Sequence, residues 1–391
     1  MPRYTVGFSN HVDSTGTQNR TVNSSHKDAM DISETPFGKT NSDESTPCYH
    51  LCNASGLHVS LIPYGATLAQ VQTVDKFGQS SPITLGFPNL SGYLGPHPSF
   101  GSTVGRFANR IADGIFTLDG KTHTLSRNEG AHHLHGGEKG LGRQWWHAEP
   151  FSHQATQTVS QHCPQTQPSE VGVTFSLKSP AGEMGYPGNL EARTTYILRE
   201  DNTLTIRFWA QTDAPTHVNF TNHTYWNLAL GCQDTVHDHT LLIAATHRLS
   251  VDEDTIPTGE YLPLAGTDFD FSTPRHVGRQ LEALRTQDLN GFDHCYANPT
   301  AGHTPPKAVL KSVQSGRCLS IESTQPGLQL YTSQFLSGKA HDGGFGSYAG
   351  ICLEPQHYPN TPNRNAFPST RLNPGNTYEE EILYRFWVEN D

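Results

Sequence analysis

Several features that would place a chain in a common protein class are missing from this sequence. Its 391 residues include 26 lysine and arginine residues against 37 aspartate and glutamate residues, a formal net charge of -11. Nucleic acids and anionic membrane surfaces are bound through a surplus of basic side chains, so this balance argues against both as partners. The sequence also contains no run of about 20 apolar residues, which a membrane-spanning helix requires.

A disulfide framework and a secretory signal are missing as well. The seven cysteines are odd in number and scattered along the chain, which is typical of free thiols in a reducing compartment. Residues 1–20 lack the apolar centre of a signal peptide. We therefore predict a cytoplasmic protein that binds neither nucleic acid nor membrane. The sequence does not distinguish a monomer from a dimer.

The chain begins with a polar segment, residues 1–46, which is rich in Ser, Thr, Asn and Asp and shows no sustained apolar periodicity. Such a segment buries too little apolar surface to offset the entropy lost on ordering, so we predict a disordered extension. The composition changes near Cys48, and we assign residues 47–391 to one folded domain.

Apolar residues that alternate with polar ones predict β-strands throughout this domain. Leu204, Ile206 and Phe208 show the pattern, which recurs at 57–61, 116–121, 328–333 and 379–388. The best helix candidate, at 279–289, is short, and the Gln/Thr/Ser-rich residues 153–170 predict a surface loop or an insertion between strands. The 36 glycines and 26 prolines provide many turns. We predict an all-β fold, one large antiparallel β-sandwich.

Four short stretches place an ionisable residue in an apolar or glycine-containing setting. They are Gly105–Ile111, Leu134–Gly137, Asn219–Leu228 and Gly350–Gln356. Charged side chains are rarely buried without a partner. Each stretch alone fits a structural role equally well, in which an Arg pairs with a carboxylate or a His bonds a backbone carbonyl.

Histidine is abundant, with 22 residues, and two groups lie close together in the sequence. One contains His132, His133 and His135, and the other His237 and His239. Histidine is a common metal ligand, but neither group has the spacing of a helical zinc motif or a neighbouring cysteine pair. We therefore expect scattered surface histidines and no metal or other cofactor.

Taken together, the four stretches resemble the aldose 1-epimerase (galactose mutarotase) family. Further matching motifs, in the family's order, are Tyr64-Gly65-Ala66, Leu85-Gly86-Phe87, Gly185-Tyr186-Pro187-Gly188, Gly291-Phe292-Asp293-His294 and Gln325-Pro326-Gly327-Leu328-Gln329. The match extends over nearly everything after residue 46. It implies the family's galactose mutarotase-like supersandwich, and an isomerase that interconverts the anomers of free hexoses such as galactose and glucose without a cofactor.

The resemblance also implies residue roles. His223 matches the family's general acid and Glu354 its general base. The matching sugar-binding residues are Asn109, Arg110, His135, Asp293 and Gln329. An acid and a base on opposite sides of the C1–O5 bond suit the reaction, because ring opening takes a proton from O1 and delivers one to O5.

Two alternatives stay open. A hexose-6-phosphate 1-epimerase would need a cationic phosphate pocket, for which Arg106 and Arg110 are the nearest pair of basic residues. A non-catalytic carbohydrate-binding sandwich would need the cleft but not an acid and a base together. Trp226 or Trp145 could offer an aromatic face to a sugar, although core packing is the expected role of each.

Overall fold

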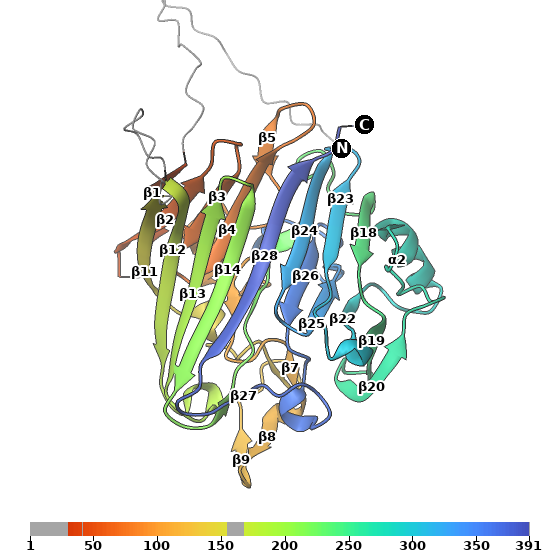
Figure 1. Ribbon diagram of the computed structural model, residues 1–391. Coiled ribbons are helices and arrows are strands. Elements are labelled where there is room, and N and C mark those ends of the chain that lie inside the picture. The colour runs from red at the N-terminus through yellow and green to blue at the C-terminus, as the bar shows by residue number, and fades with distance from the viewer. Residues whose placement is uncertain (1–29, 41, 155–167, 391) are drawn as a thin grey trace, which may run out of the picture.

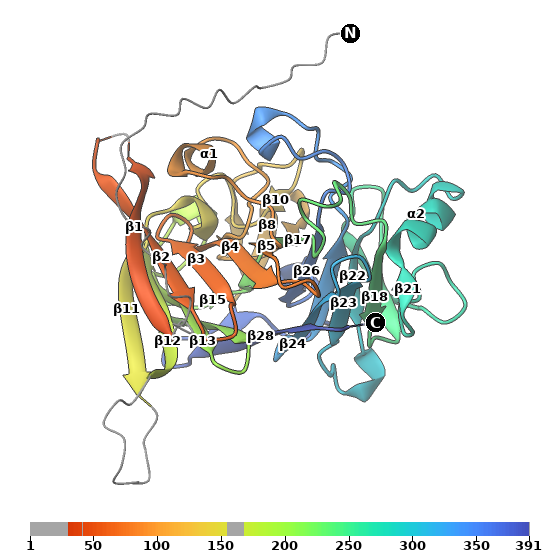
Figure 2. The same cartoon turned by 90° about the horizontal axis from the view of Figure 1, so that it is seen from above.

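The computed structural model describes residues 30–40, 42–154 and 168–390. In this part of the chain, two layers of antiparallel β-sheet pack face to face, as Figures 1 and 2 show. One layer is a nine-stranded sheet, and the other consists of a five-stranded and a six-stranded sheet side by side. A bridge between Thr84 and Trp226 joins these two smaller sheets. The architecture confirms the predicted antiparallel β-sandwich.

The nine-stranded sheet runs in the order β11 (His147–Gln154), β12 (Pro168–Ser179), β13 (Leu190–Arg199), β14 (Thr203–Thr212), β28 (Tyr378–Val388), β24 (Arg317–Ser323), β23 (Ala308–Ser312), β18 (His239–Ile243), β21 (Arg275–His276). Its centre is the C-terminal strand β28, which pairs with β14 on one side and β24 on the other. The last strand of the chain therefore joins the earlier and later halves of this sheet.

The second layer holds the site. Its five-stranded sheet comprises β1 (Asp31–Lys39), β2 (Ser45–Cys52), β3 (His58–Ile62), β4 (Thr67–Val74), β5 (Ser80–Pro82), and its six-stranded sheet β17 (Tyr225–Trp226), β26 (Ile351–Gln356), β25 (Gly327–Tyr331), β22 (Asp293–Ala297), β19 (His247–Val251), β20 (Pro257–Pro263). Short pairs complete the β-structure: β6 (Thr103–Val104) with β16 (Thr221–Asn222), β7 (Arg110–Ile111) with β10 (His133–Leu134), β8 (Ile115–Leu118) with β9 (Lys121–Thr124), β15 (Thr216–His217) with β27 (Arg371–Leu372).

Helices are few in the described residues. The α-helices are α1 (Leu90–Leu94) and α2 (Val277–Arg285). Single 3₁₀ turns lie at Ala112–Gly114, Leu141–Arg143, Glu183–Gly185, Pro299–Ala301, Ala340–Asp342 and Thr361–Asn363. The predicted helix at 279–289 corresponds to α2, which begins two residues earlier and buries Val277, Leu281 and Leu284.

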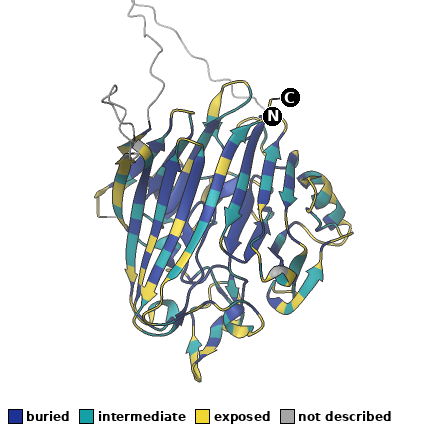
Figure 3. Cartoon of the chain, in the orientation of Figure 1, coloured by how far each residue is buried: buried dark blue, intermediate teal, exposed yellow. Residues whose placement is uncertain are grey.

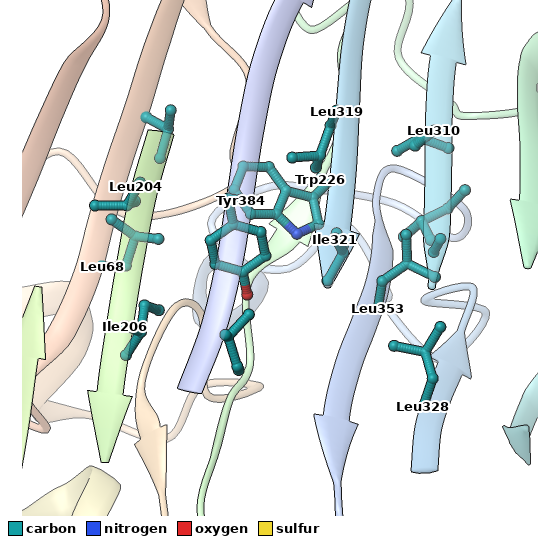
Figure 4. Packing of buried hydrophobic residues seen from close by; sticks show 14 of the residues in the cluster. Leu68, Leu204, Ile206, Trp226, Leu310, Leu319, Ile321, Leu328, Leu353 and Tyr384 are labelled. Atoms are coloured by element: carbon teal, nitrogen blue, oxygen red, sulfur yellow. The ribbon is translucent and has the colours of Figure 1, made fainter. Parts of the chain in front are cut away.

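The core lies between the two layers. Figure 3 shows buried residues alternating with more exposed ones along the strands of the nine-stranded sheet, as the alternating sequence predicts. In Figure 4, Trp226 packs on Tyr384 of β28, with ring centroids 5.1 Å apart. Both side chains are fully buried among Leu68, Ile206 and Leu353 and other apolar residues of both layers. Trp226 is thus a core residue, and the sugar-facing alternative for it is wrong.

Two segment predictions need correction. The polar segment 1–46 was expected to be a disordered extension, yet β1 lies within it and pairs along its length with β2. Most side chains of β1 are exposed, so the strand is held mainly by its backbone hydrogen bonds with β2, with Ile32 and Phe37 adding apolar contacts to the core. The ends of the predicted loop 153–170 likewise belong to β11 and β12. Residues 1–29 and 155–167 lie outside the described residues.

Candidate active site

A cleft of about 1020 Å³ lies over the outer face of the six-stranded sheet. Successive side chains of a strand point to opposite faces, and Leu328 and Leu353 point into the core (Figure 4). Gln329 and Glu354 are the next residues along β25 and β26, so they point the other way and line the cleft. They lie directly opposite each other in the ladder. The alternation that builds the core therefore also supplies the polar floor of the cleft.

Glu354 and His223 meet on this floor. Nε2 of His223 lies 3.8 Å from Oε2 of Glu354, and their side chains are 7% and 2% exposed. The backbone fixes the imidazole, because His223 N donates to the carbonyl of Ser102 and its own carbonyl accepts from Gly101 N. The ring also stacks on that of Tyr225, with centroids 5.1 Å apart. The imidazole is thus held in place beside the buried carboxyl group.

This geometry corrects one expectation. The sequence suggested an acid and a base on opposite sides of the sugar's C1–O5 bond. A separation of 3.8 Å leaves no space for a sugar ring between His223 and Glu354. Because both side chains rise from the same floor, a ring can contact them only by lying over the pair.

Burial shifts the proton affinities of this pair in opposite directions. Removal from water, together with the nearby charge of Asp293, raises the pKa of Glu354 well above its ordinary value. Removal from water lowers the pKa of His223 to about 4. Both shifts favour the uncharged form. Oε2 of Glu354 has no hydrogen-bond partner within the described residues, so it is an acceptor for a ligand to satisfy.

Arg110 lies on the cleft wall between two carboxylates. Its Nε is 2.8 Å from Oε2 of Glu129, and its Nη2 is 3.4 Å from Oδ2 of Asp293. Burial lowers the pKa of Arg110, but the charges of Asp293 and Glu129 outweigh this effect and hold the pKa above its ordinary value. The carbonyl of Arg110 accepts a 2.7 Å hydrogen bond from the amide of Asn360, which fixes this segment from behind.

Asn109 and His135 reach the cleft from turns. Both have left-handed backbone conformations, with φ angles of 67° and 53°. The backbone N–H of Asn109 donates to Nδ1 of His135 over 3.1 Å. Burial lowers the pKa of His135 well below its ordinary value, so the ring is neutral and its proton is on Nε2. The His135 ring lies 5.1 Å from that of His223 between centroids and can act as a hydrogen-bond donor beside it.

Gln329 and Asp293 form one unit. Nε2 of Gln329 donates to Oδ1 of Asp293 over 2.6 Å, while Arg110 contacts the other carboxylate oxygen. Oε1 of Gln329 is buried and has no partner among the described residues. The cleft thus brings together all seven residues singled out from the sequence: Asn109, Arg110, His135, His223, Asp293, Gln329 and Glu354.

The other residues considered from the sequence, Arg106, Trp145 and His133, contact protein groups around the cleft rather than lining it. Arg106 is 2% exposed, and its guanidinium donates to Ser179 and to nearby backbone carbonyls rather than to the cleft. Trp145 is 41% exposed and packs edge-on against Tyr64 at the cleft mouth. His133 is held between Ser126 O and the Tyr186 hydroxyl.

Neither histidine group highlighted in the sequence brings three metal-binding side chains together in the described part of the chain. One group of three does occur there: His223, Cys352 and Glu354 have ligand atoms within 4.8 Å of one another. No helix of the described residues is long and apolar enough to cross a bilayer.

Residues 47–385 match the sequence family described as aldose 1-epimerase. The chain is 37% identical to the galactose mutarotase of Sus scrofa over 362 residues, which span 92% of this chain and 99% of the relative. It is 34% identical to the aldose 1-epimerase of Escherichia coli over 345 residues, or 87% of this chain and 94% of the relative.

The chain belongs to the aldose 1-epimerase family. Solved structures agree with this assignment. An aldose epimerase homologue from C. elegans has a TM-score of 0.75 and 31% identity, covering 88% of this chain and 100% of its own. The galactose 1-epimerase of Lactobacillus acidophilus has a TM-score of 0.77 and 27% identity, covering 93% of this chain and 100% of its own.

Three neighbours of the site were not singled out from the sequence. Glu129, paired with Arg110, lies in a turn that carries no motif. Tyr225 and Cys352 were present in matching stretches, but as apolar positions. Their contacts with His223 arise because β17 and β26 pair, with Tyr225 opposite Cys352. Only strand pairing between distant segments could have revealed this.

Proposed function

We propose that this chain catalyses the interconversion of the α and β anomers of free hexoses such as galactose and glucose. The observation that carries the proposal is the contact between the buried side chains of His223 and Glu354 on the floor of a cleft. An aldose 1-epimerase must move two protons at adjacent oxygens of one sugar. A positioned imidazole and a buried carboxyl group 3.8 Å apart are suited to this task.

The proposed cycle uses Glu354 as the base and His223 as the acid. Glu354 takes the proton of the C1 hydroxyl, while His223 delivers a proton to the ring oxygen O5, and the C1–O5 bond breaks. The open aldehyde turns about its C1–C2 bond. Glu354 then returns its proton to the carbonyl oxygen, and His223 takes back the proton of the O5 hydroxyl as the ring closes. Protons balance over the cycle, and each positioned transfer contributes about 10²–10⁴-fold.

Burial also determines which protonation state of the pair is favoured before the sugar reacts. A protonated Glu354 and a neutral His223 are the forms that burial favours. These are the forms that face the open aldehyde just before closure. A cyclic sugar therefore has to draw the proton toward His223, which its C1 hydroxyl does by donating a hydrogen bond to the unpartnered Oε2 of Glu354.

The remaining polar residues are proposed to hold the sugar. Asp293 accepts hydrogen bonds from sugar hydroxyls, while Arg110 and Gln329 fix its orientation. The neutral His135 donates through Nε2, and Asn109 holds that ring in place. Arg110 also stabilises the negative charge that develops as the ring opens.

We further propose that the protein works in the cytoplasm. Cys48, Cys232, Cys295, Cys318 and Cys352 form no disulfide, a pattern typical of a reducing compartment.

Polarimetry of freshly dissolved α-galactose tests the function. We expect the wild-type protein to accelerate the drift in optical rotation far above the buffer rate, and His223→Asn to abolish most of this gain. Glucose and glucose 6-phosphate are run in parallel. Because Arg110 is already neutralised by two carboxylates, the phosphorylated sugar should react more slowly. A protein that leaves the drift unchanged for all three sugars would refute the proposal.

A further inference from the structure

A buried thiol that the proposed reaction does not use lies beside the general acid and the general base, in the apolar layer under the cleft floor. Sγ of Cys352 lies 3.6 Å from Nδ1 of His223. Cys352 and Glu354 are two residues apart on β26, so both side chains face the cleft side of the sheet. One ligand atom from each of Cys352, Glu354 and His223 lies within 4.8 Å of the other two.

We propose that this triad is an inhibitory site for a soft divalent metal ion, with Zn²⁺ as the ion of best fit. In tetrahedral zinc sites the metal lies about 2.3 Å from sulfur and about 2.0–2.2 Å from nitrogen or oxygen, so neighbouring ligand atoms are separated by roughly 3.5 Å. One ligand atom from each residue already lies within 4.8 Å of the other two, but Sγ of Cys352 contacts Nδ1 of His223 while Oε2 of Glu354 faces Nε2. The imidazole and its neighbours therefore have to turn so that one ring nitrogen, the sulfur and the oxygen meet at the ion. Three protein ligands leave a fourth position for water from the cleft.

Charge supports the same assignment. A thiolate and a carboxylate carry two negative charges, which one divalent cation neutralises. This matters here because an uncompensated charge is costly in a buried site. Oε2 of Glu354 is buried, unpartnered among the described residues and directed at His223, so it offers a free lone pair to the ion. Mg²⁺ prefers six oxygen ligands and keeps its waters, and it has no such fit here.

Binding would release two protons, one from the Cys352 thiol and one from the Glu354 carboxyl group, and would transfer no electrons. The Cys352 thiol loses its proton to solvent as the zinc–sulfur bond forms, since a coordinating thiol is deprotonated. Burial raises the pKa of this thiol well above its ordinary value, so the metal has to compete with the proton. Inhibition by Zn²⁺ should therefore strengthen as the pH rises. The metal would also occupy both proton-transfer groups, so galactose and Zn²⁺ should compete.

The test combines inhibition with a readout that needs no activity. Zn²⁺ should inhibit anomer exchange by the wild-type protein, with full recovery on adding EDTA and no effect of Mg²⁺ at the same concentration. Galactose should raise the Zn²⁺ concentration needed for half inhibition. Co²⁺ titrated into the sugar-free protein should produce a cobalt–thiolate charge-transfer band, which galactose suppresses.

Variants locate the site, each rate being compared with that variant's own metal-free rate. Cys352→Ser keeps the shape but removes the soft ligand, and should raise the half-inhibiting Zn²⁺ concentration at least about tenfold and abolish the cobalt band. Cys318→Ser, which alters a buried thiol in the other layer, is the matched control and should change neither.

Equal zinc sensitivity of Cys352→Ser and the wild type, or the absence of a cobalt–thiolate band in the wild type, would overturn the proposal. This inference rests on the proposed function only for its inhibitory consequence. A protein that shows the cobalt band but never accelerates mutarotation would keep the metal site and refute the enzymatic function.

Discussion

Two buried polar centres lie within a short stretch of chain, around Arg106 and around Arg110, and they are built in opposite ways. Arg106 donates to the Ser179 hydroxyl and to the carbonyls of Ser179, Pro180, Pro187 and Gly188. All five N–H groups of the guanidinium can thus find acceptors in the surrounding loops. This centre is a closed hydrogen-bond network that ties loops together.

The cleft floor beside Arg110 is an open network. Oε2 of Glu354 and Oε1 of Gln329 are buried but lack partners in the described residues. Buried polar atoms are normally satisfied, because leaving one unpaired costs about 1–3 kcal/mol. The contrast teaches that a charged residue in an apolar stretch of sequence does not by itself identify a binding site. Buried acceptors that face a cleft and lack hydrogen-bond partners do identify one.

The substitution Glu354→Gln is expected to have the largest effect on the open network of the cleft floor. It keeps the shape of the side chain and removes the base. We expect anomer exchange to fall by at least about 10³-fold. Burial raises the pKa of Glu354, so the stability that its protonated form gives is lost as the pH rises through that folded-state value. The variant should therefore melt no lower than the wild type at pH 8, as calorimetry would show. Near wild-type exchange would refute the assigned base.

Arg106→Lys tests the closed network. A lysine cannot reach the several carbonyls that the guanidinium bridges, and the orphaned acceptors should lower the free energy of unfolding by about 3 kcal/mol. Urea unfolding measures this change. The folded variant should retain kcat/KM for galactose, since Arg106 does not line the cleft. A variant that is stable but slow would place Arg106 in the site after all.

Arg110→Lys should lower kcat/KM more than it lowers stability, the opposite of what is expected for Arg106→Lys. The lysine loses the simultaneous contacts with Glu129 and Asp293, and the loss of one charge-assisted hydrogen bond predicts a fall in kcat/KM of about 30-fold. The unfolding free energy should change less than in Arg106→Lys. If exchange is unchanged, Arg110 does not stabilise the opening ring.

The pH dependence of kcat/KM tests the open network as a whole. His223 and Glu354 together need to carry one proton for the reaction. A second proton binds when His223 is protonated while Glu354 is also protonated, near the lowered His223 pKa of about 4. The rate should stay level from mildly acidic to neutral pH and fall about tenfold per pH unit below that value. A fall in kcat/KM that begins near the ordinary histidine pKa would show that burial does not lower the pKa of His223.

The smallest effect is expected for Glu129→Gln. Its side chain is 37% exposed, and partly exposed ion pairs contribute up to about 1 kcal/mol, so KM should rise by about threefold while kcat is nearly constant. Steady-state kinetics with galactose measures both terms. An equal loss in kcat would make Glu129 part of the chemistry rather than a support for Arg110.

Much of the fold was predictable because alternation reports directly on burial. The pattern at 204–209 lies in β14, that at 57–61 meets β3, and the Asp119-Gly120 turn joins β8 to β9. Strand β1 was missed because its side chains are mostly exposed and carry no periodic signal. Its order comes from backbone pairing with β2, which composition does not encode.

The candidate site was predictable in its membership but not in its geometry. Motif matching named the residues that line the cleft, whereas the 3.8 Å contact of His223 with Glu354 depends on the pairing of β16 with β6 and of β17 with β26. The same pairing places Cys352 beside the imidazole. Glu129 carried no signal, because its role exists only through its distance from Arg110.

The position of β28 has a consequence for biosynthesis. The last long strand lies at the centre of the nine-stranded sheet, between β14 and β24. Until residues 378–388 have left the ribosome, the facing edges of β14 and β24 have no strand between them, and Trp226 lacks its contact with Tyr384. The nascent polypeptide can therefore close its largest sheet only once β28 has emerged, and a stop codon before residue 378 would leave two unjoined half-sheets with aggregation-prone edges.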